Sequence, residues 1–551
     1  MQSEHDKIYI GVDVGTGSAR AGLFDASGRM IAAARHPIRT WHLPDGIVEQ
    51  STQDIWQACA QAIGAAMREG GVAPARVAGI GFDATCSLVA VDADGAPVTV
   101  SPSGDDARNV IVWMDHRAIP EAAEINATGH PALRYVGGRI SPEMETPKLL
   151  WLKRHLPESF ARARHLFDLA DWLSFRATGS QARSLCTVTC KWTYAQHEGG
   201  WNRDYFERIG LAELLDDDAA RIGRDVVAPG STLGDGLSAD AAAELGLVAG
   251  IAVGASLIDA HAGAIGTIAS PDADGGAVAP TARMAYIMGT SACVMATTDT
   301  PCFTPGVWGP YDSAMIPGLW LNEGGQSAAG VAIDTLVRSH PGFAEASERA
   351  AAAGVDVLTW LERRVLDRVS SPSHAALLAR DLHVLPDYLG NRSPEADPGA
   401  RAMIAGLTID HGPEGLEALY VAGICGLGYG LAGIIDALRA QGVRFDSVIM
   451  SGGASQSRLV RQLIADATGV QVQLAATPEP VLLGSAMLGA VAAGGFPDLP
   501  AAMAAMSGLG ASTQPTPIEI TRFHAAKREA YTAMQALDRQ LRDRMSAVAS
   551  T

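Results

Sequence analysis

The chain has 551 residues, of which 42 are basic and 60 are acidic, and its net charge is −18. This length exceeds that of an ordinary single domain, so we expect several units, or fewer if they are large. A hydrophobic fraction of 48% is enough for real cores and argues against disorder over most of the chain. A broad electropositive surface is hard to build from this composition, which makes nucleic acid a poor candidate partner.

The start of the chain and its cysteines indicate a compartment. The sequence MQSEHDKIYIGVDVG enters a strand pattern at once and has no secretory leader pattern, and the apolar run at 483–494 is broken by glycine and is short for a membrane span. Cys186 and Cys190 are separated by three residues, and no second pair stands near them to complete a metal site. We therefore expect a cytoplasmic protein with reduced thiols, no membrane partner and no structural metal at its cysteines.

The first half of the chain alternates strands and helices. The segments IYIGVDVG, ARAGLFD and MIAAARHPI are separated by glycine turns and predict successive antiparallel hairpins. Apolar residues recur at helical spacing over 53–68, and VAGIGFDATCSLVAVD predicts strand, turn and strand. This order is typical of an α/β protein.

A related pattern returns in the second half. ARMAYIMGTSACVMATT predicts two strands around a glycine turn, and LEALYVAGICGLGYGLAGIIDALRAQG predicts a long helix. VIMSGGASQSRLVRQLIADATG then predicts strand, turn and helix. The repetition suggests a duplicated fold, with a Pro/Gly/Asp-rich break at 268–280 that divides the chain into units 1–268 and 269–551. The stretch 521–545 is charged and helix-prone.

Three glycine turns carry candidate ligand chemistry. In the first, Asp13, Thr16, Gly17 and Ser18 stand between two strands, where a sharp turn directs N–H groups at one point and can hold phosphate oxygens. Asp13 beside the turn can hold the metal ion that accompanies a nucleotide. Taken alone, the turn could equally be an ordinary hairpin with a solvated aspartate.

The other two turns lie in the second half. Gly289, Thr290 and Ser291 form a similar turn between strands, and two such turns fit a nucleotide held between two units. Gly452, Gly453, Ala454 and Gln456 lie between a strand and a helix, where glycine permits close approach of a planar ligand or phosphate to the helix N-terminus. This third turn is neither a Walker A nor a Rossmann pattern, because the lysine and the glycine spacing are missing.

The order of these turns resembles that of the actin/hexokinase/Hsp70 ATPase superfamily: phosphate 1, phosphate 2, adenosine. Further segments resemble the FGGY carbohydrate kinases, namely GASLIDAHAGAIG, VIVWMDHRA, LNEGGQSAAG and PVLLGSAMLGAVAAG. The resemblance covers about residues 8 to 495. It implies two actin-like, ribonuclease H-like ATPase domains with a cleft between them.

The resemblance also implies the roles of individual residues. Asp259 in DAHAG matches the catalytic base, which takes the proton of a sugar hydroxyl as that oxygen attacks the γ-phosphate of ATP. It implies Mg²⁺ as a cofactor, with Asp13 and Asp259 near it through water. Arg20 and Gln326 join the three turns as nucleotide-binding candidates, and Trp113 and Asp115 lie near the sugar pocket. A homodimer is what relatives lead us to expect.

Within the family the chain is most similar to ribulokinases. Cys86 and Ser87 lie in the stretch TCSLV, Lys191 in TVTCKWTY matches a sugar-contacting lysine, and Glu323 in LNEGGQS matches a sugar-contacting glutamate. One departure is Val294, where close relatives often have histidine. The resemblance implies D-ribulose as the first candidate acceptor, with L-ribulose, xylulose and ribitol as alternatives.

Simpler interpretations stay open at this point. Asp259 could cap a helix, Lys191 could be a surface lysine, and Trp113 and Trp192 could serve packing. Cys86 could be a small buried residue, and His261 could be an ordinary core or surface histidine. Two other functions also remain: a chaperone or filament ATPase of the same superfamily, and a catalytically dead homologue that binds sugar without transferring phosphate.

Overall fold

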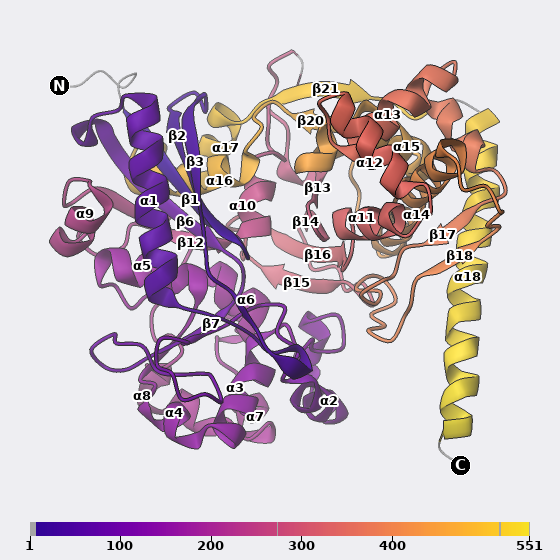
Figure 1. Ribbon diagram of the computed structural model, residues 1–551. Helices are drawn as coiled ribbons and strands as arrows, with labels where there is room; N and C mark the ends of the chain where they lie inside the picture. Colours follow the sequence, from indigo (N-terminus) through magenta and orange to yellow (C-terminus); the bar gives the residue numbers. More distant parts are fainter. Residues whose placement is uncertain (1–6, 273, 517–518, 550–551) are drawn as a thin grey trace.

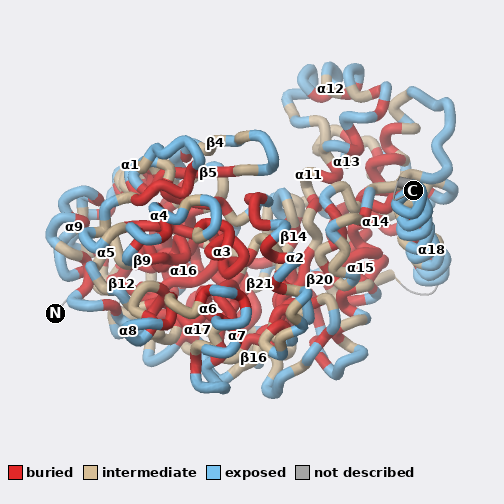
Figure 2. Tube along the Cα trace, turned by 90° about the horizontal axis from the view of Figure 1, so that it is seen from below, coloured by how far each residue is buried: buried red, intermediate tan, exposed pale blue. Residues whose placement is uncertain are grey.

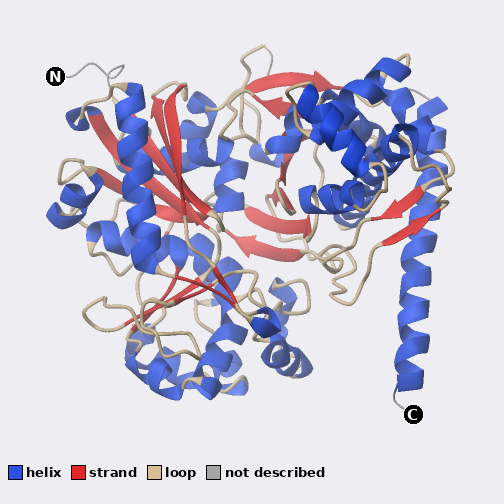
Figure 3. Ribbon diagram, viewed as in Figure 1, coloured by secondary structure: helices blue, strands red, loops and turns tan. Residues whose placement is uncertain are grey.

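The computed structural model describes residues 7–272, 274–516 and 519–549. Two mixed β-sheets, each covered by helices, stand next to one another, and a third, smaller sheet with its own helices lies beside the first (Figures 1 and 3). The chain is therefore an α/β protein, as the alternation of strand and helix patterns predicts.

The first sheet has the strand order β12–β6–β1–β2–β3. Its strands are β1 (Ile8–Val14), β2 (Ser18–Asp25), β3 (Met30–Pro37), β6 (Val77–Ala84) and β12 (Ala252–Ile258). The three strands of the N-terminal meander pair antiparallel, while β6 and β12 run parallel to β1. Every residue of β1 is buried, because helices cover both faces of this sheet.

The second sheet repeats this topology. Its order is β15–β16–β14–β13–β19–β20–β21, built from β13 (Arg283–Met288), β14 (Ala292–Thr298), β15 (Trp308–Asp312), β16 (Trp320–Gln326), β19 (Ser447–Ser451), β20 (Gln471–Ala475) and β21 (Leu509–Thr513). The strands β13, β14 and β16 pair antiparallel in that order, and β15, which falls between β14 and β16 in the sequence, lies on the outer side of β16. The strands β19 and β20 continue parallel to β13. The duplicated fold expected from the two glycine hairpins is thus present in the strand order.

Two helices cover the opposite faces of the first sheet. The helix α1 (Thr52–Gly70) begins at Ser51, whose side chain accepts a hydrogen bond from the Asp54 amide, and it ends at Gly71 in the left-handed conformation. It matches the helix predicted over 53–68. The helix α16 (Pro480–Ala492) packs on the other face, although it comes from the second half of the sequence.

Glycines in the first sheet allow α16 to approach this closely. A Cβ atom on Gly11 would lie 1.9 Å from the Leu482 carbonyl oxygen, and one on Gly81 would lie 2.0 Å from that of Ser485. Both distances are far below van der Waals contact, so only glycine fits at these positions. The tight packing joins the two halves, since α16 follows β20 of the second sheet and lies on the first.

The chain leaves the first sheet after β6. The segment VAGIGFDATCSLVAVD forms two strands around a turn, as predicted, and these strands, β6 and β7 (Leu88–Val91), belong to different sheets. The turn at Thr85–Ser87 carries the chain from the first sheet into a small sheet of order β4–β5–β8–β7–β9. Its other strands are β4 (Trp41–His42), β5 (Val48–Gln50), β8 (Val110–Ile111) and β9 (His165–Asp168). Near this sheet, in the lower part of Figure 1, lie α2 (Ile119–Ala127), α3 (Glu145–His155), α4 (Pro157–Arg162), α7 (Arg203–Arg208) and α8 (Asp216–Ala219), while α5 (Leu169–Thr178) packs on β12 of the first sheet.

The core of the second half is organised around one long helix, α14 (Pro413–Ala440). Among the described residues it is the one helix long and apolar enough to cross a membrane by composition, with a mean hydropathy of 1.8 in its most apolar window. However, 89% of that window is buried inside the protein, which explains its apolar composition. In Figure 2 the buried segments run through both halves, while the C-terminal helix α18 (Glu519–Ala549) is exposed over much of its length.

Candidate active site

Three carboxylates meet at one edge of the first sheet. Asp13 and Asp83 are paired neighbours near the carboxyl ends of the parallel strands β1 and β6, and Asp259 directly follows β12, the next parallel strand. Parallel strands deliver their carboxyl ends to the same edge, so residues from distant positions in the sequence converge here. This edge of the first sheet therefore brings together three carboxyl groups, of which Asp13 and Asp83 are buried and Asp259 is half-buried.

Asp259 is the first residue of the short helix α10 (Asp259–Ile265), and its Oδ1 accepts a hydrogen bond from the Ala260 amide at 2.7 Å. Burial, together with the nearby charge of Asp13, raises the pKa of Asp259 to about 6. Burial and Asp13 also raise the pKa of Asp83 well above its ordinary value. Asp259 is half-buried at the helix N-terminus. A carboxylate with this pKa can act as a base near neutral pH.

The two phosphate-type turns have the same local structure. In the first turn the Gly15 amide donates to the Ser18 carbonyl at 3.1 Å, and in the second the Gly289 amide donates to the Ser291 carbonyl at 2.9 Å. Gly17 and Thr290 are exposed at the tips of their turns. Each half of the molecule thus contributes one open backbone turn at the carboxyl end of its first strand.

The third turn adjoins the second. Because β13 and β19 are parallel neighbours, Gly452 follows β19 beside the end of β13, and a Cβ atom on Gly452 would lie 2.3 Å from the Met288 carbonyl oxygen. Gly452 also has φ = 89°, which glycine adopts without strain. Gly453 and Gln456 are exposed, and Ala454 is half-buried. The second and third turns form one continuous rim.

A buried ion pair lies between the two halves. Lys191 belongs to α6 (Leu185–Trp192), and its Nζ lies 3.2 Å from both carboxylate oxygens of Glu323 on β16. The same ammonium sits 4.4 Å from the ring centroid of Trp308. Burial alone would raise the pKa of Glu323, but Lys191 and His261 lower it to about 2. Lys191 is 2% exposed, which excludes the interpretation of it as a surface lysine.

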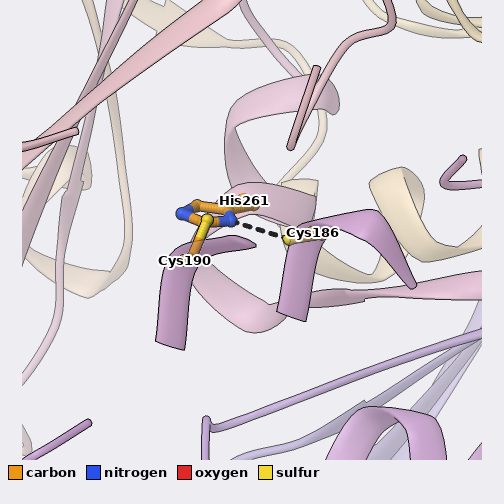
Figure 4. A group of neighbouring side chains, drawn as sticks. All are labelled: Cys186, Cys190 and His261. Atoms are coloured by element: carbon orange, nitrogen blue, oxygen red, sulfur yellow. Dashed lines mark hydrogen bonds between the residues drawn. The ribbon is translucent and has the colours of Figure 1, made fainter. Parts of the chain in front are cut away.

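A second buried contact stands behind this pair. His261, two residues after Asp259, lies with Nδ1 3.0 Å from the Cys186 Sγ and with Nε2 3.4 Å from Glu323 Oε2. Figure 4 shows the His261 ring near Cys186 and Cys190, which lie one turn apart on α6. Burial would raise the pKa of Cys186, but a hydrogen bond from Cys190 and the imidazole of His261 lower it. These contacts connect α6 to α10.

Arg392 is a site residue that the sequence reasoning missed. Its guanidinium lies 3.3 Å from the Glu143 carboxylate, which belongs to the first half, and between the rings of Trp113 at 5.8 Å and Trp308 at 5.5 Å. Burial would lower the pKa of Arg392, but the charges of Glu143, Cys293 and Glu323 raise it. No local pattern distinguishes Arg392 in a loop rich in glycine and proline, so its role follows only from the fold.

The predicted sugar residues divide into two groups. The first group surrounds Arg392 or the ion pair and consists of Trp113, Cys86, Lys191 and Glu323. The Trp113 Nε1 donates a hydrogen bond to the Thr16 hydroxyl at 2.9 Å, which links the pocket to the first phosphate turn. Trp192 is buried in the core, as its packing interpretation predicts.

The second group, Asp115 and Ser87, makes its hydrogen bonds within the protein. The Asp115 carboxylate is fully buried, accepts the Val48 amide and the Arg117 amide and pairs with the Arg117 guanidinium. The Ser87 hydroxyl accepts the Trp113 amide at 3.1 Å. Both side chains hold the loop that carries Trp113, because their hydrogen-bonding groups are already paired within the protein.

Two predicted nucleotide-binding residues also have partners within the protein. Arg20 forms ion pairs with Asp13 and with Glu479, which precedes α16. The Gln326 side chain donates to the Leu427 carbonyl at 3.0 Å and accepts from the Tyr286 hydroxyl at 2.8 Å. Gln326 and Arg392 line the same small hollow beside the end of β16.

Two repeated α/β sheets, a glycine turn in each of them and a carboxylate beside a buried polar pocket form the arrangement expected of a phosphotransferase of the actin-like class. Residues 8–266 match the N-terminal domain and residues 284–493 the C-terminal domain of the FGGY family of carbohydrate kinases. The chain belongs to this family and is a carbohydrate kinase.

Individual relatives match most of this chain. A human FGGY carbohydrate kinase domain-containing protein is 45% identical over 514 residues, covering 92% of this chain and 93% of its own. The D-ribulokinase of Saccharomyces cerevisiae is 38% identical over 522 residues, covering 90% of this chain and 73% of its own. The crystal structure of a xylulose kinase from Rhodospirillum rubrum has 21% identity and a TM-score of 0.77, covering 97% of this chain and 99% of that chain, and is similar in fold.

Proposed function

We propose that this kinase transfers the γ-phosphate of ATP to a pentulose, with D-ribulose as the preferred acceptor and D-ribulose 5-phosphate as the product. The observation that carries the proposal is the buried Lys191–Glu323 pair beside Asp259, which offers a fixed cation and anion to sugar hydroxyls. The identity to a yeast D-ribulokinase supports the choice of sugar. L-ribulose, xylulose and ribitol are the alternative acceptors of the same pocket.

Asp259 acts as the base in this proposal. Its carboxylate takes the proton from the terminal hydroxyl of the sugar as that oxygen forms a bond to the γ-phosphorus, and the bond from the γ-phosphorus to the β,γ-bridging oxygen breaks to release ADP. A pKa of about 6 leaves Asp259 mostly ionised at pH 7 and makes it a stronger base than an ordinary aspartate. Lys191, Glu323 and Arg392 orient the sugar so that only one hydroxyl reaches Asp259.

The carboxylates suit a magnesium ion. Asp83 Oδ1 is buried and has no hydrogen-bond partner among the described residues, and Asp13 and Asp259 lie beside it, so oxygen ligands of the kind Mg²⁺ prefers are available. Mg²⁺ would neutralise charge on the β- and γ-phosphates. Asp13 and Asp259 would hold it through water, and the Thr16–Ser18 and Gly289–Ser291 turns would donate amides to the phosphates.

The proposal extends to adenosine binding, cellular compartment, domain closure and oligomeric state. Residues Gly452 to Gln456 would hold the adenosine, and Arg20 would keep Asp13 in place through their ion pair. We propose a cytoplasmic enzyme, units 1–268 and 269–551 that close over the substrates, and a homodimer.

The variant Asp259→Asn tests the base. It keeps the shape of the side chain but cannot accept the proton, so kcat should fall by about 10²- to 10⁴-fold while the affinity for ATP, measured by equilibrium binding, stays within about threefold. Near-normal turnover of Asp259→Asn would refute its role as base.

A further inference from the structure

The cluster of Cys186, Cys190 and His261 is not used by the phosphoryl transfer. One ligand atom from each residue lies within 4.8 Å of the others, and all three side chains are buried. The sequence predicts no metal site at these cysteines, because no second pair stands near them in the chain. The fold supplies the third donor from α10, at a distance of 71 residues from Cys190 in the sequence.

We propose that Cys186, Cys190 and His261 form a binding site for a soft divalent metal ion, best suited to Zn²⁺, that clamps α6 to α10. Thiolate and imidazole are the donors that Zn²⁺ prefers, and they differ in kind from the carboxylates that suit Mg²⁺ at the neighbouring sheet edge. The inference goes beyond the kinase reaction and does not depend on which sugar the enzyme uses.

The spacing of the donors fits this ion. Cys186 and Cys190 are one helical turn apart, so both Sγ atoms lie on the same face of α6. The Cys186 Sγ lies 3.0 Å from the His261 Nδ1, whereas sulfur and nitrogen ligands of a tetrahedral Zn²⁺ are separated by about 3.5 Å. The two helices therefore need to part by only about half an ångström to admit the ion.

The surroundings of the histidine also match a metal ligand. Metal-binding histidines commonly direct their second ring nitrogen at a carboxylate, which fixes the ring orientation and increases the basicity of the ligand. Glu323 Oε2 lies 3.4 Å from the His261 Nε2, on the side of the ring opposite to Cys186. A metal at Nδ1 would thus leave the contact with Glu323 intact.

A metal ion at this site would also affect the geometry of the proposed sugar pocket. The helix α6 carries Lys191 and α10 carries Asp259, so a metal between them would fix the distance from the sugar-binding cation to the base. With three protein donors the fourth position is left for water, and such a site should release its ion to chelators more readily than a closed site with four protein ligands.

Cobalt spectroscopy of the full-length protein tests the proposal without sugar or nucleotide. After reduction and removal of metal, titration with Co²⁺ alone should produce a thiolate-to-cobalt charge-transfer band that saturates at about one Co²⁺ per chain and disappears when Zn²⁺ is added. Absence of the band, or no saturation near one equivalent, overturns the proposal, and the wild-type result does not depend on the folding of any variant.

Matched variants locate the ion. Cys186→Ser and Cys190→Ser should each weaken Co²⁺ binding at least tenfold, and His261→Gln should do the same while retaining the sulfur band at high Co²⁺. Cys59→Ser and Cys425→Ser, which alter buried cysteines in α1 and α14, are the controls and should bind as the wild type does. Equal binding by the double variant Cys186→Ser/Cys190→Ser and by the wild type would overturn the assignment.

Discussion

The proposed acceptor pocket and the rim formed by the second and third glycine turns present different kinds of chemical group. Around the pocket, charged side chains are paired with one another: the buried Lys191 with Glu323, and the half-buried Arg392 with Glu143. Along the rim, Gly453 stands in an open backbone turn and has no neighbour among the described residues within 4 Å of an added Cβ, and Gly17 in the first turn is equally open. A phosphate accepts hydrogen bonds from any well-placed amide, whereas one sugar among many isomers must be recognised by directed side chains.

This difference predicts that substitutions in the pocket cost far more activity than substitutions on the rim. In the pocket, removing one partner leaves the other charge buried and unpaired. On the rim, the main chain is the ligand and a side chain can change with little consequence.

The largest effect is expected at the buried ion pair. Lys191→Met should lower kcat/KM for the sugar by about 10²- to 10³-fold, because the sugar loses a charged partner and Glu323 loses its counter-ion. The same variant should lower the free energy of unfolding by about 3–5 kcal/mol, measured by urea denaturation.

The double variant Lys191→Met/Glu323→Gln is the control for this pair. It removes both charges, so stability should recover by most of the loss while activity stays low. Recovery of activity along with stability would show that the pair serves packing and does not bind the sugar.

A smaller loss is expected at Arg392. Arg392→Ala removes the contact with Glu143 across the two halves, and KM for the sugar should rise by about 10- to 100-fold with a smaller change in KM for ATP. Arg392→Lys keeps the charge but loses the planar group between Trp113 and Trp308, and should recover part of the loss. Equal increases in both KM values would contradict a role on the sugar side.

The pH dependence of the reaction follows from Asp259. Burial and Asp13 raise its pKa to about 6, so lowering the pH through 6 protonates the base and should reduce kcat/KM for the sugar about tenfold per pH unit below that value. Above pH 7 this group should cause no further change. A profile that is flat between pH 5 and 7, measured at saturating Mg²⁺ and ATP, would contradict the raised pKa.

The smallest effect is expected on the rim, where two adjacent glycines form a matched pair. Gly453→Ala adds a methyl group to open space and should change KM for ATP by less than about threefold. Gly452→Ala must adopt φ = 89° and would press on the Met288 carbonyl, so it should lower the free energy of unfolding by about 1–3 kcal/mol. Similar behaviour of the two variants in thermal denaturation would show that the rim is not built as described.

Local patterns in the sequence predict one part of this site and miss another. The glycine turns, the strands beside them and Asp259 at the start of a helix can be predicted because each depends on a few adjacent residues. Arg392, Asp83 and the packing of α16 on the first sheet depend on contacts between residues hundreds of positions apart. His261 and Cys186 are likewise brought together by the fold, across 75 positions of the sequence.

The motif around Asp115 predicts more side chains in the pocket than the structure places there. Its sequence suggests a sugar contact, but the carboxylate is paired with Arg117 and two backbone amides, and only Trp113 of this motif reaches the pocket. A short motif identifies the segment that builds a site. Which of its side chains face the ligand is decided by the partners that the fold brings to each of them.

The most direct test of the account is the rate of ADP release by the wild-type enzyme with and without an acceptor. With Mg²⁺ and ATP present, D-ribulose should stimulate release strongly and give the highest kcat/KM in a panel of D- and L-pentuloses, pentitols and glycerol. No stimulation by any ketose or polyol would contradict the central claim that the buried pocket beside Asp259 is a sugar site.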